Sequence, residues 1–241
     1  MSKTLYFIPG TMCNEDLWLP TWQLLRKQCH EDFQLIHLAI PRAGSMDEVV
    51  NALSEQIVAE QAILVGFSLG GYIASAIALK LGGKLQQLLI VSNFPKNLPP
   101  AEIKQRKRTI DWINQRGYSG LPTKRINDLL HPDIEQLNLS GYQDIKKTMV
   151  TMDRALGKEV LLHQLSVSMN RPNLLPMLAQ LVLPITLLVG DADSLIELVV
   201  LSAELQGNNT IVLKEVANTG HMLPLESPQA LASILANFLT S

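Results

Sequence analysis

The sequence contains few of the residues from which cross-linked or metal-bound folds are built. Only two of its 241 residues are cysteines, Cys13 and Cys29, and they form no CxxC pair. The five histidines show no HExxH pattern or other ligand spacing. We therefore expect two free thiols, no disulfide framework, no metal site and no other cofactor.

Long hydrophobic runs and a strong charge imbalance are also missing. The richest apolar stretch, LVLPITLLVG, is shorter than the roughly 18 residues of a membrane span and is interrupted by proline. The N-terminal stretch MSKTLYFIPG lacks the basic region, long apolar segment and cleavage site of a secretory signal. With a net charge of −2, the composition is that of an ordinary soluble globular protein. We expect a cytoplasmic protein that binds neither nucleic acid nor membrane.

What the sequence does contain is an alternation of short apolar runs with longer segments of helical period. This alternation predicts an α/β fold with a mostly parallel sheet and helices on both faces. The expected strands are 4–9, 33–40, 62–66, 87–93, 184–190 and 210–216, and the expected helices are 16–28, 45–60, 69–82, 194–206 and 227–239.

The segment from residue 95 to residue 183 interrupts the alternation, because it contains no convincing strand. We expect residues 1–94 and 184–241 to form the core, and residues 95–183 to form a helical cap over the carboxyl edge of the sheet, where open α/β proteins bind ligands. The helices expected in the cap are 99–116, 122–130, 141–156, 157–169 and 173–182.

The expected cap and core differ in charge. Residues 95–183 contain 13 Lys and Arg against 8 Asp and Glu, whereas the remainder contains 7 against 14. The densest basic stretch, KQRKR at 104–108, is typical of a solvated helix face. The alternative is that it docks an anionic substrate or partner, which a basic surface would attract.

The stretch AILVGFSLGGYIAS at 62–75 places one serine between an expected strand and an expected helix. Gly66, Ser68 and Gly70 form a G-x-S-x-G pattern, whose glycines let strand and helix pack closely around a sharp turn that projects the hydroxyl. The N–H of Leu69 then lies at a helix N-terminus, which favours a developing oxyanion. Phosphate binding is disfavoured, because the chain lacks the lysine of a GxxxxGK[ST] loop and a GxGxxG motif.

A serine nucleophile needs a base, and a histidine base needs an acid that orients it. His221, in NTGHMLPLESP, follows the last expected strand and is the best placed of the histidines. Asp191 and Asp193, in VGDADSLI, directly follow a buried strand. The spacing alone leaves both acids as candidates.

These three motifs stand in the order found in the α/β-hydrolase superfamily, which the sequence resembles over its full length. In that family the acid usually sits third after the glycine, so the resemblance selects Asp193. The family's second oxyanion donor comes from the loop after the first core strand, here IPGTMCNEDLW. The resemblance places the backbone N–H of Thr11 at that donor position, although Pro9 replaces the family's histidine.

Within the superfamily, the small size and compact cap resemble bacterial carboxylesterases, including enzymes that cleave the methyl ester of pimeloyl-acyl-carrier protein. The resemblance implies a serine hydrolase that cleaves a carboxylic ester or thioester through an acyl-enzyme on Ser68. The basic cap would fit an acidic acyl carrier.

The resemblance leaves two other functions open. Relatives use the same triad for elimination or carbon–carbon bond cleavage, and other relatives only bind a ligand. In each case we expect an apolar pocket, and the residues expected to line it are Met12, Phe67, Trp112, Met149 and Met152.

Overall fold

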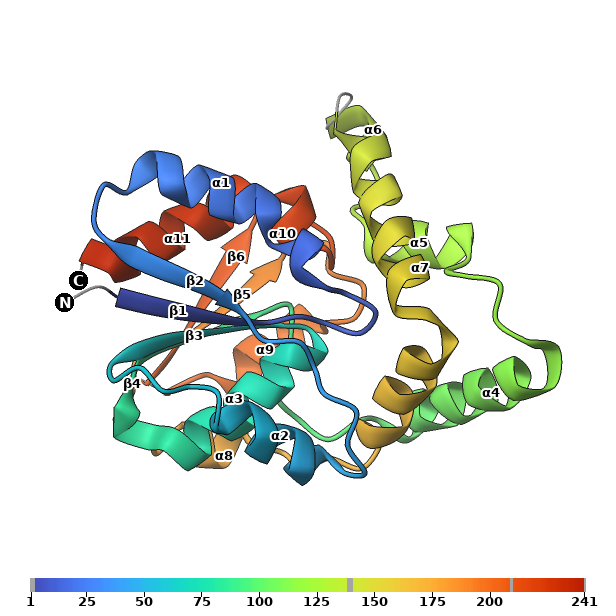
Figure 1. The fold of residues 1–241 in the computed structure, drawn as a ribbon, viewed down its shortest axis with the longest axis horizontal. Coiled ribbons are helices and arrows are strands. Elements are labelled where there is room, and N and C mark those ends of the chain that lie inside the picture. The colour runs from blue at the N-terminus through green and yellow to red at the C-terminus, as the bar shows by residue number, and fades with distance from the viewer. Residues whose placement is uncertain (1–2, 138–140, 209, 241) are drawn as a thin grey trace.

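The computed structural model describes residues 3–137, 141–208 and 210–240. Six strands form one sheet in the order β2-β1-β3-β4-β5-β6, and every neighbouring pair is parallel (Figure 1). The predicted parallel sheet is confirmed. The strands are β1 (Lys3–Ile8), β2 (Phe33–His37), β3 (Ala62–Phe67), β4 (Leu85–Val91), β5 (Ile185–Gly190) and β6 (Ile211–Val216).

Helices cover both faces of the sheet, as expected (Figure 1). One face carries α1 (Leu19–Gln28), α10 (Leu223–Glu226) and α11 (Pro228–Thr240). The other carries α2 (Met46–Ser54), α3 (Leu69–Leu81), α8 (Leu175–Leu178) and α9 (Leu198–Glu204). Short 3-10 turns at Glu15–Leu17 and Gly82–Lys84 precede α1 and β4.

The alternation of side chains along each strand divides the core into two apolar clusters. In β1, Leu5 and Phe7 pack on the face of α1 and α11, whereas Tyr6 and Ile8 pack on the face of α2 and α3. All four are buried because successive strand residues point to opposite faces and both faces are covered.

Between β4 and β5, the described residues form helices and no strand, as the sequence predicts for residues 95–183. We call residues 95–183 the insert. Its helices α4 to α7 stand beyond the edge of the sheet at which the strands end (Figure 1). Before α8 the insert contains α4 (Pro100–Arg116), α5 (Thr123–Leu129), α6 (Ile134–Leu137) and α7 (Tyr142–Val167).

The helices of the insert agree with the predicted helix boundaries at one point and differ from them at two others. Gly157 has a φ of 72° and breaks α7 into two helical pieces, at the boundary expected between 141–156 and 157–169. The short α6 was not expected, and α8 covers only four of the ten residues expected in 173–182.

The helix expected from residue 194 begins only at Leu198. The preceding residues form a turn in which Asp193 N–H donates to the Gly190 carbonyl at 3.2 Å. The Asp193 carboxylate accepts from the N–H of Leu195 at 2.9 Å. An Asp side chain that bonds the backbone two residues ahead stabilises a turn in place of a helix.

The described helices include none that combines the length and the apolar character needed to cross a membrane.

Helix α3 lies against the sheet with its backbone almost in contact. A Cβ built on Gly70 would lie 2.2 Å from the carbonyl oxygen of Ile8 and 2.4 Å from that of Pro9. One built on Gly66 would lie 2.2 Å from the carbonyl oxygen of Gly70. Glycine at these positions is therefore required for the turn from β3 into α3 to form as it does.

The substitution Gly70→Ala should lower the free energy of unfolding by about 1–3 kcal/mol, because the added methyl group meets backbone that has no room to move. Chemical denaturation measures this loss. Gly83→Ala is the control, because a Cβ there meets nothing within 4 Å, and we expect a change below about 0.5 kcal/mol. Equal losses in the two variants would contradict the packing argument.

Candidate active site

Ser68 occupies the turn between β3 and α3 in a strained backbone conformation. Its φ of 50° and ψ of −117° lie in a region that residues other than glycine rarely adopt. The N–H of Ser68 donates to the carbonyl of Val91 at 2.9 Å, and its carbonyl accepts from the N–H of Gly71. These bonds hold the turn to the end of β4 and to α3, and the serine side chain stays half-buried.

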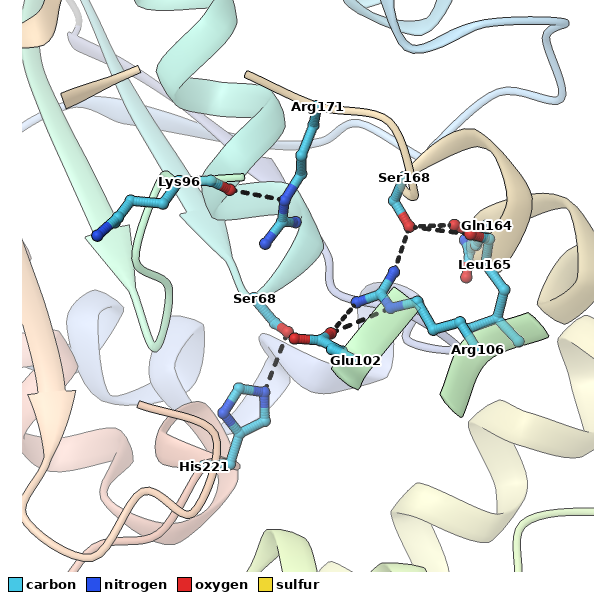
Figure 2. A network of polar contacts seen from close by, with 9 residues as sticks. All are labelled: Ser68, Lys96, Glu102, Arg106, Gln164, Leu165, Ser168, Arg171 and His221. Carbon is cyan, nitrogen blue, oxygen red and sulfur yellow. Dashed lines mark hydrogen bonds and ion pairs between the residues drawn. The ribbon is translucent and has the colours of Figure 1, made fainter. Parts of the chain in front are cut away.

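The structure brings Ser68, His221 and Asp193 into one hydrogen-bonded series. His221 Nε2 lies 3.0 Å from Ser68 Oγ (Figure 2), and His221 Nδ1 lies 2.9 Å from both carboxylate oxygens of Asp193. A carboxylate accepts hydrogen bonds, so the tautomer that fits this geometry donates from Nδ1 to Asp193 and leaves Nε2 to accept from the Ser68 hydroxyl. His221 is 4% exposed and Asp193 is 6% exposed, so the imidazole and the carboxylate are largely shielded from water.

The two neighbouring aspartates make different contacts. The carboxylate of Asp191 accepts from the backbone N–H groups of Asn218 and Thr219, each at 3.1 Å. It therefore holds the backbone of the loop that carries His221, whereas Asp193 contacts the imidazole ring itself.

The loop after β5 and the loop after β6 approach each other closely. A Cβ on Gly190 would lie 2.2 Å from the carbonyl oxygen of Thr219, so only glycine fits between the two loops. This approach brings Asp193 within reach of a histidine 28 residues further along the chain.

The insert also holds the loop of His221. The N–H of His221 donates to the carbonyl of Leu129, the last residue of α5, at 2.9 Å. Glu226 Oε2 accepts from the N–H of Gly220 at 3.1 Å and from that of His131, in the insert, at 2.8 Å. Sequence reasoning missed these contacts, because Leu129 stands in no recognisable motif and the motif that contains Glu226 does not indicate a partner in the insert.

The environment of Glu226 opposes its ionisation. Burial raises the pKa of this carboxyl group, while the backbone N–H groups and nearby His221 act in the opposite direction. Its second oxygen, Oε1, is buried without a partner among the described residues.

The two expected oxyanion donors belong to segments that flank Ser68. The N–H of Leu69 lies in the first turn of α3, where amide groups have no acceptor within the helix. Thr11 follows Gly10, and a Cβ on Gly10 would lie 3.1 Å from the Cβ of Ser68. The loop after β1 therefore passes directly beside the serine.

Gln164 on α7 is a further residue that sequence reasoning missed. Its side-chain oxygen accepts from the N–H of Met12 at 2.9 Å, across 152 positions of the chain. Met12 has a φ of 57°, so this bond holds the residue in a left-handed conformation. No local pattern in the sequence pairs Gln164 with the loop after β1.

The residues expected to line an apolar pocket are not all brought together. Phe67, Met149 and Met152 belong to one buried cluster, and the ring centroid of Phe67 lies 5.3 Å from that of His221. Met12 is buried beside Gln164. Trp112 is 57% exposed on α4, where the neighbouring Ile113 takes the buried position, so its indole lies outside this cluster.

The described part of the chain has no cluster of side chains suited to a metal ion. No group of three or more His, Cys, Asp or Glu side chains there is placed to hold a metal ion. Cys13 is buried and burial raises the pKa of its thiol to about 12, so it is a poor ligand and a poor nucleophile.

Comparison with known proteins identifies proteins similar to this chain. A curated pimeloyl-[acyl-carrier protein] methyl ester esterase from Pseudoalteromonas atlantica is 27% identical over 84 residues, which make up 31% of this chain and 33% of that protein. The match thus spans about a third of that relative's length.

Solved structures resemble the whole chain. A thermophilic esterase from Thermogutta terrifontis is 17% identical with a TM-score of 0.80, covering 100% of this chain and 90% of its own. The enol-lactonase from Burkholderia xenovorans LB400 is 14% identical with a TM-score of 0.79, and the match covers 100% of this chain and 92% of the lactonase. MenH from S. aureus is 17% identical with a TM-score of 0.74, and the match covers 99% of this chain and 93% of MenH. These likenesses establish a shared fold.

The model of the alpha/beta hydrolase family matches residues 5–234, nearly the whole length of the sequence. The chain therefore belongs to the alpha/beta hydrolase family.

Proposed function

We propose that the chain is a serine hydrolase that cleaves a carboxylic ester or thioester. The observation that carries the proposal is the hydrogen-bonded series of Ser68, His221 and Asp193, in which Nε2 of the imidazole lies 3.0 Å from a half-buried serine hydroxyl. Membership of the alpha/beta hydrolase family and the esterases among its relatives support it.

In this mechanism His221 moves protons while Ser68 forms and breaks bonds to the acyl carbon. Nε2 of His221 takes the Ser68 proton as Oγ attacks the carbonyl, and Asp193 stabilises the resulting imidazolium. The imidazolium then gives its proton to the leaving alcohol or thiol, which leaves an acyl group on Ser68. Water attacks this acyl-enzyme with His221 again as base, and the acid product and free Ser68 result.

The negative charge on the carbonyl oxygen needs donors that are already in place. We assign this role to the backbone N–H groups of Leu69 and Thr11, one on each side of Ser68. Gln164 supports the second donor indirectly, because its bond to Met12 N–H fixes the residue that follows Thr11.

Labelling with a fluorophosphonate probe tests the nucleophile directly. The probe should label wild type and should not label Ser68→Ala. It should label His221→Ala far more slowly than wild type, because the serine hydroxyl then lacks its base. Hydrolysis of 4-nitrophenyl esters should fall at least about 10,000-fold in both variants. Ser233→Ala, which changes a serine on α11, is the control and should behave as wild type.

Equal labelling of all four proteins would overturn the assignment of Ser68. If Ser68 is labelled as expected, activity across 4-nitrophenyl esters, acyl-CoA thioesters and acyl-carrier-protein esters identifies the leaving group. Labelling of Ser68 without hydrolysis of any of these would favour elimination or carbon–carbon cleavage by the same residues.

The two aspartates should differ sharply in their effect on rate. Asp193→Asn should reduce kcat about 10,000-fold, because an amide no longer holds the required tautomer of His221 or stabilises its charged form. Asp191→Asn should reduce kcat by less than about 10-fold and lower the melting temperature, because only backbone contacts are weakened. Steady-state kinetics with thermal melts separates the two effects. A larger loss of kcat in the Asp191 variant would reverse the assignment.

A further inference from the structure

Two arginines of the insert lie near each other, one of them against the helix that begins after Ser68, and the mechanism above uses neither. Arg106 lies on α4, and Arg171 lies just after the end of α7. We call them the arginine pair. In Figure 2 the guanidinium group of Arg171 is seen on the side of Ser68 opposite His221, and the Glu102–Arg106 ion pair is seen to the right of Ser68.

Arg106 is fixed by three contacts. Its Nε and Nη2 donate to Glu102 Oε1 at 3.0 and 2.6 Å, and its Nη1 donates to Ser168 Oγ. Ser168 in turn donates to the backbone carbonyl of Gln164, the residue that holds Met12 N–H. The side chain of Arg106 is only 18% exposed, so its guanidinium is turned toward the protein.

Arg171 is fixed against the helix that begins at Ser68. Its guanidinium carbon lies 4.6 Å from the ring centroid of Tyr72, and Tyr72 N–H donates to the Ser68 carbonyl at 3.3 Å. Tyr72 Oη donates to the carbonyl of Pro172, next to Arg171, at 3.0 Å. Arg171 Nε donates to the carbonyl of Lys96 at 2.9 Å. Stacking and one hydrogen bond thus hold the group in place and leave its two Nη atoms for another acceptor.

The charges at this place do not balance. Within the described residues no carboxylate lies within 4 Å of Arg171, and Glu102 pairs with Arg106. Burial and the nearby Arg106 guanidinium lower the pKa of Arg171 to about 10, while Glu102 and Tyr72 act in the opposite direction.

Arg125 also lies near Glu102 and Arg106, with Asp128 as a further neighbour. Three guanidinium groups thus lie near two carboxylates, and the Glu102–Arg106 pair is the one direct ion pair among these described side chains, so Arg171 has none. An unpaired charge in a partly dehydrated place is costly unless an anion completes it.

We propose that the arginine pair binds a carboxylate of the substrate, carried on the acyl or the alcohol side of the bond that Ser68 attacks. The proposal rests on the proposed function, since it assigns a substrate class to the same site. Arginine binds carboxylates through paired N–H groups, and Glu102 on Arg106 displays that recognition within the protein itself. With its carboxylate held by the arginine pair, the substrate would be oriented with its carbonyl group toward Ser68.

The experiment compares anionic and neutral esters of equal chain length. The anionic series consists of mono-4-nitrophenyl esters of dicarboxylic acids with four to eight carbons, and the neutral series of 4-nitrophenyl esters of the monocarboxylic acids of the same lengths. Values of kcat/KM are measured for wild type, Arg171→Gln and Arg106→Gln, with Ser68→Ala as the background. Arg116→Gln is the matched control, because Arg116 is exposed on the same α4.

Wild type should prefer the anionic ester by about 10- to 100-fold at its best chain length, the range given by hydrogen bonds to charged groups. Arg171→Gln and Arg106→Gln should lose most of this preference, and Arg116→Gln should keep it. In Arg171→Gln and Arg106→Gln the kcat/KM of the anionic esters should fall about 10-fold more than that of the neutral esters, whereas Arg116→Gln should leave both series within about 3-fold of wild type. A purely structural role would lower both series together, so such a result would overturn the proposal.

Inhibition distinguishes a carboxylate site from a general anion site. Glutarate should compete with the neutral ester in wild type and lose potency in Arg171→Gln, and inorganic phosphate should compete at least 10-fold more weakly. Equal inhibition by phosphate would overturn the assignment to a carboxylate. Hydrolysis of neutral esters that depends on Ser68 but shows no charge preference would leave the proposed function standing and overturn this inference alone.

Discussion

The backbone contact between α3 and the sheet is the constraint on which the rest of the site depends. Gly70 lies against the carbonyl groups of Ile8 and Pro9, so the helix begins directly over the ends of β1 and β3. This position gives Ser68 its φ of 50° and leaves the N–H of Leu69 in the free first turn. The strained turn persists because nearly the whole of α3 is buried against the sheet, and displacing the helix would expose that apolar surface.

The insert contributes to the site by accepting hydrogen bonds from the backbone of two core loops, the loop of His221 and the loop after β1. The carbonyl of Leu129 accepts from His221 N–H, and the side chain of Gln164 accepts from Met12 N–H. Buried N–H groups without acceptors are costly, so the positions of α5 and α7 and those of the two loops are energetically linked. The insert therefore helps to place His221 and the loop after β1, in addition to any part that it has in covering the sheet edge.

The strands and the order of the three proposed catalytic residues could be predicted because their signals are local. An apolar run, a glycine turn and a helical segment lie within about a dozen residues around Ser68. Spacing alone does not distinguish Asp191 from Asp193, and the choice of Asp193 comes from the family resemblance. In the structure Asp193 contacts the His221 ring, whereas Asp191 contacts the backbone of the loop that carries it. Likewise, helical spacing indicates that KQRKR lies on a helix, but it does not say that Arg106 turns inward against Ser168, just after the end of α7, while its neighbours stay exposed.

The charge arrangement around Ser68 links substrate binding to the position of the insert. Arg171 is anchored to α3 through Tyr72, and Arg106 is anchored to α4 and α7 through Glu102 and Ser168. Two like charges held by different elements repel each other, and an anion between them turns this repulsion into attraction on both sides. A bound carboxylate would thus stabilise the contact between the insert and α3. Because α7 also carries Gln164, that stabilisation would reach the loop beside Ser68 as the substrate carbonyl arrives.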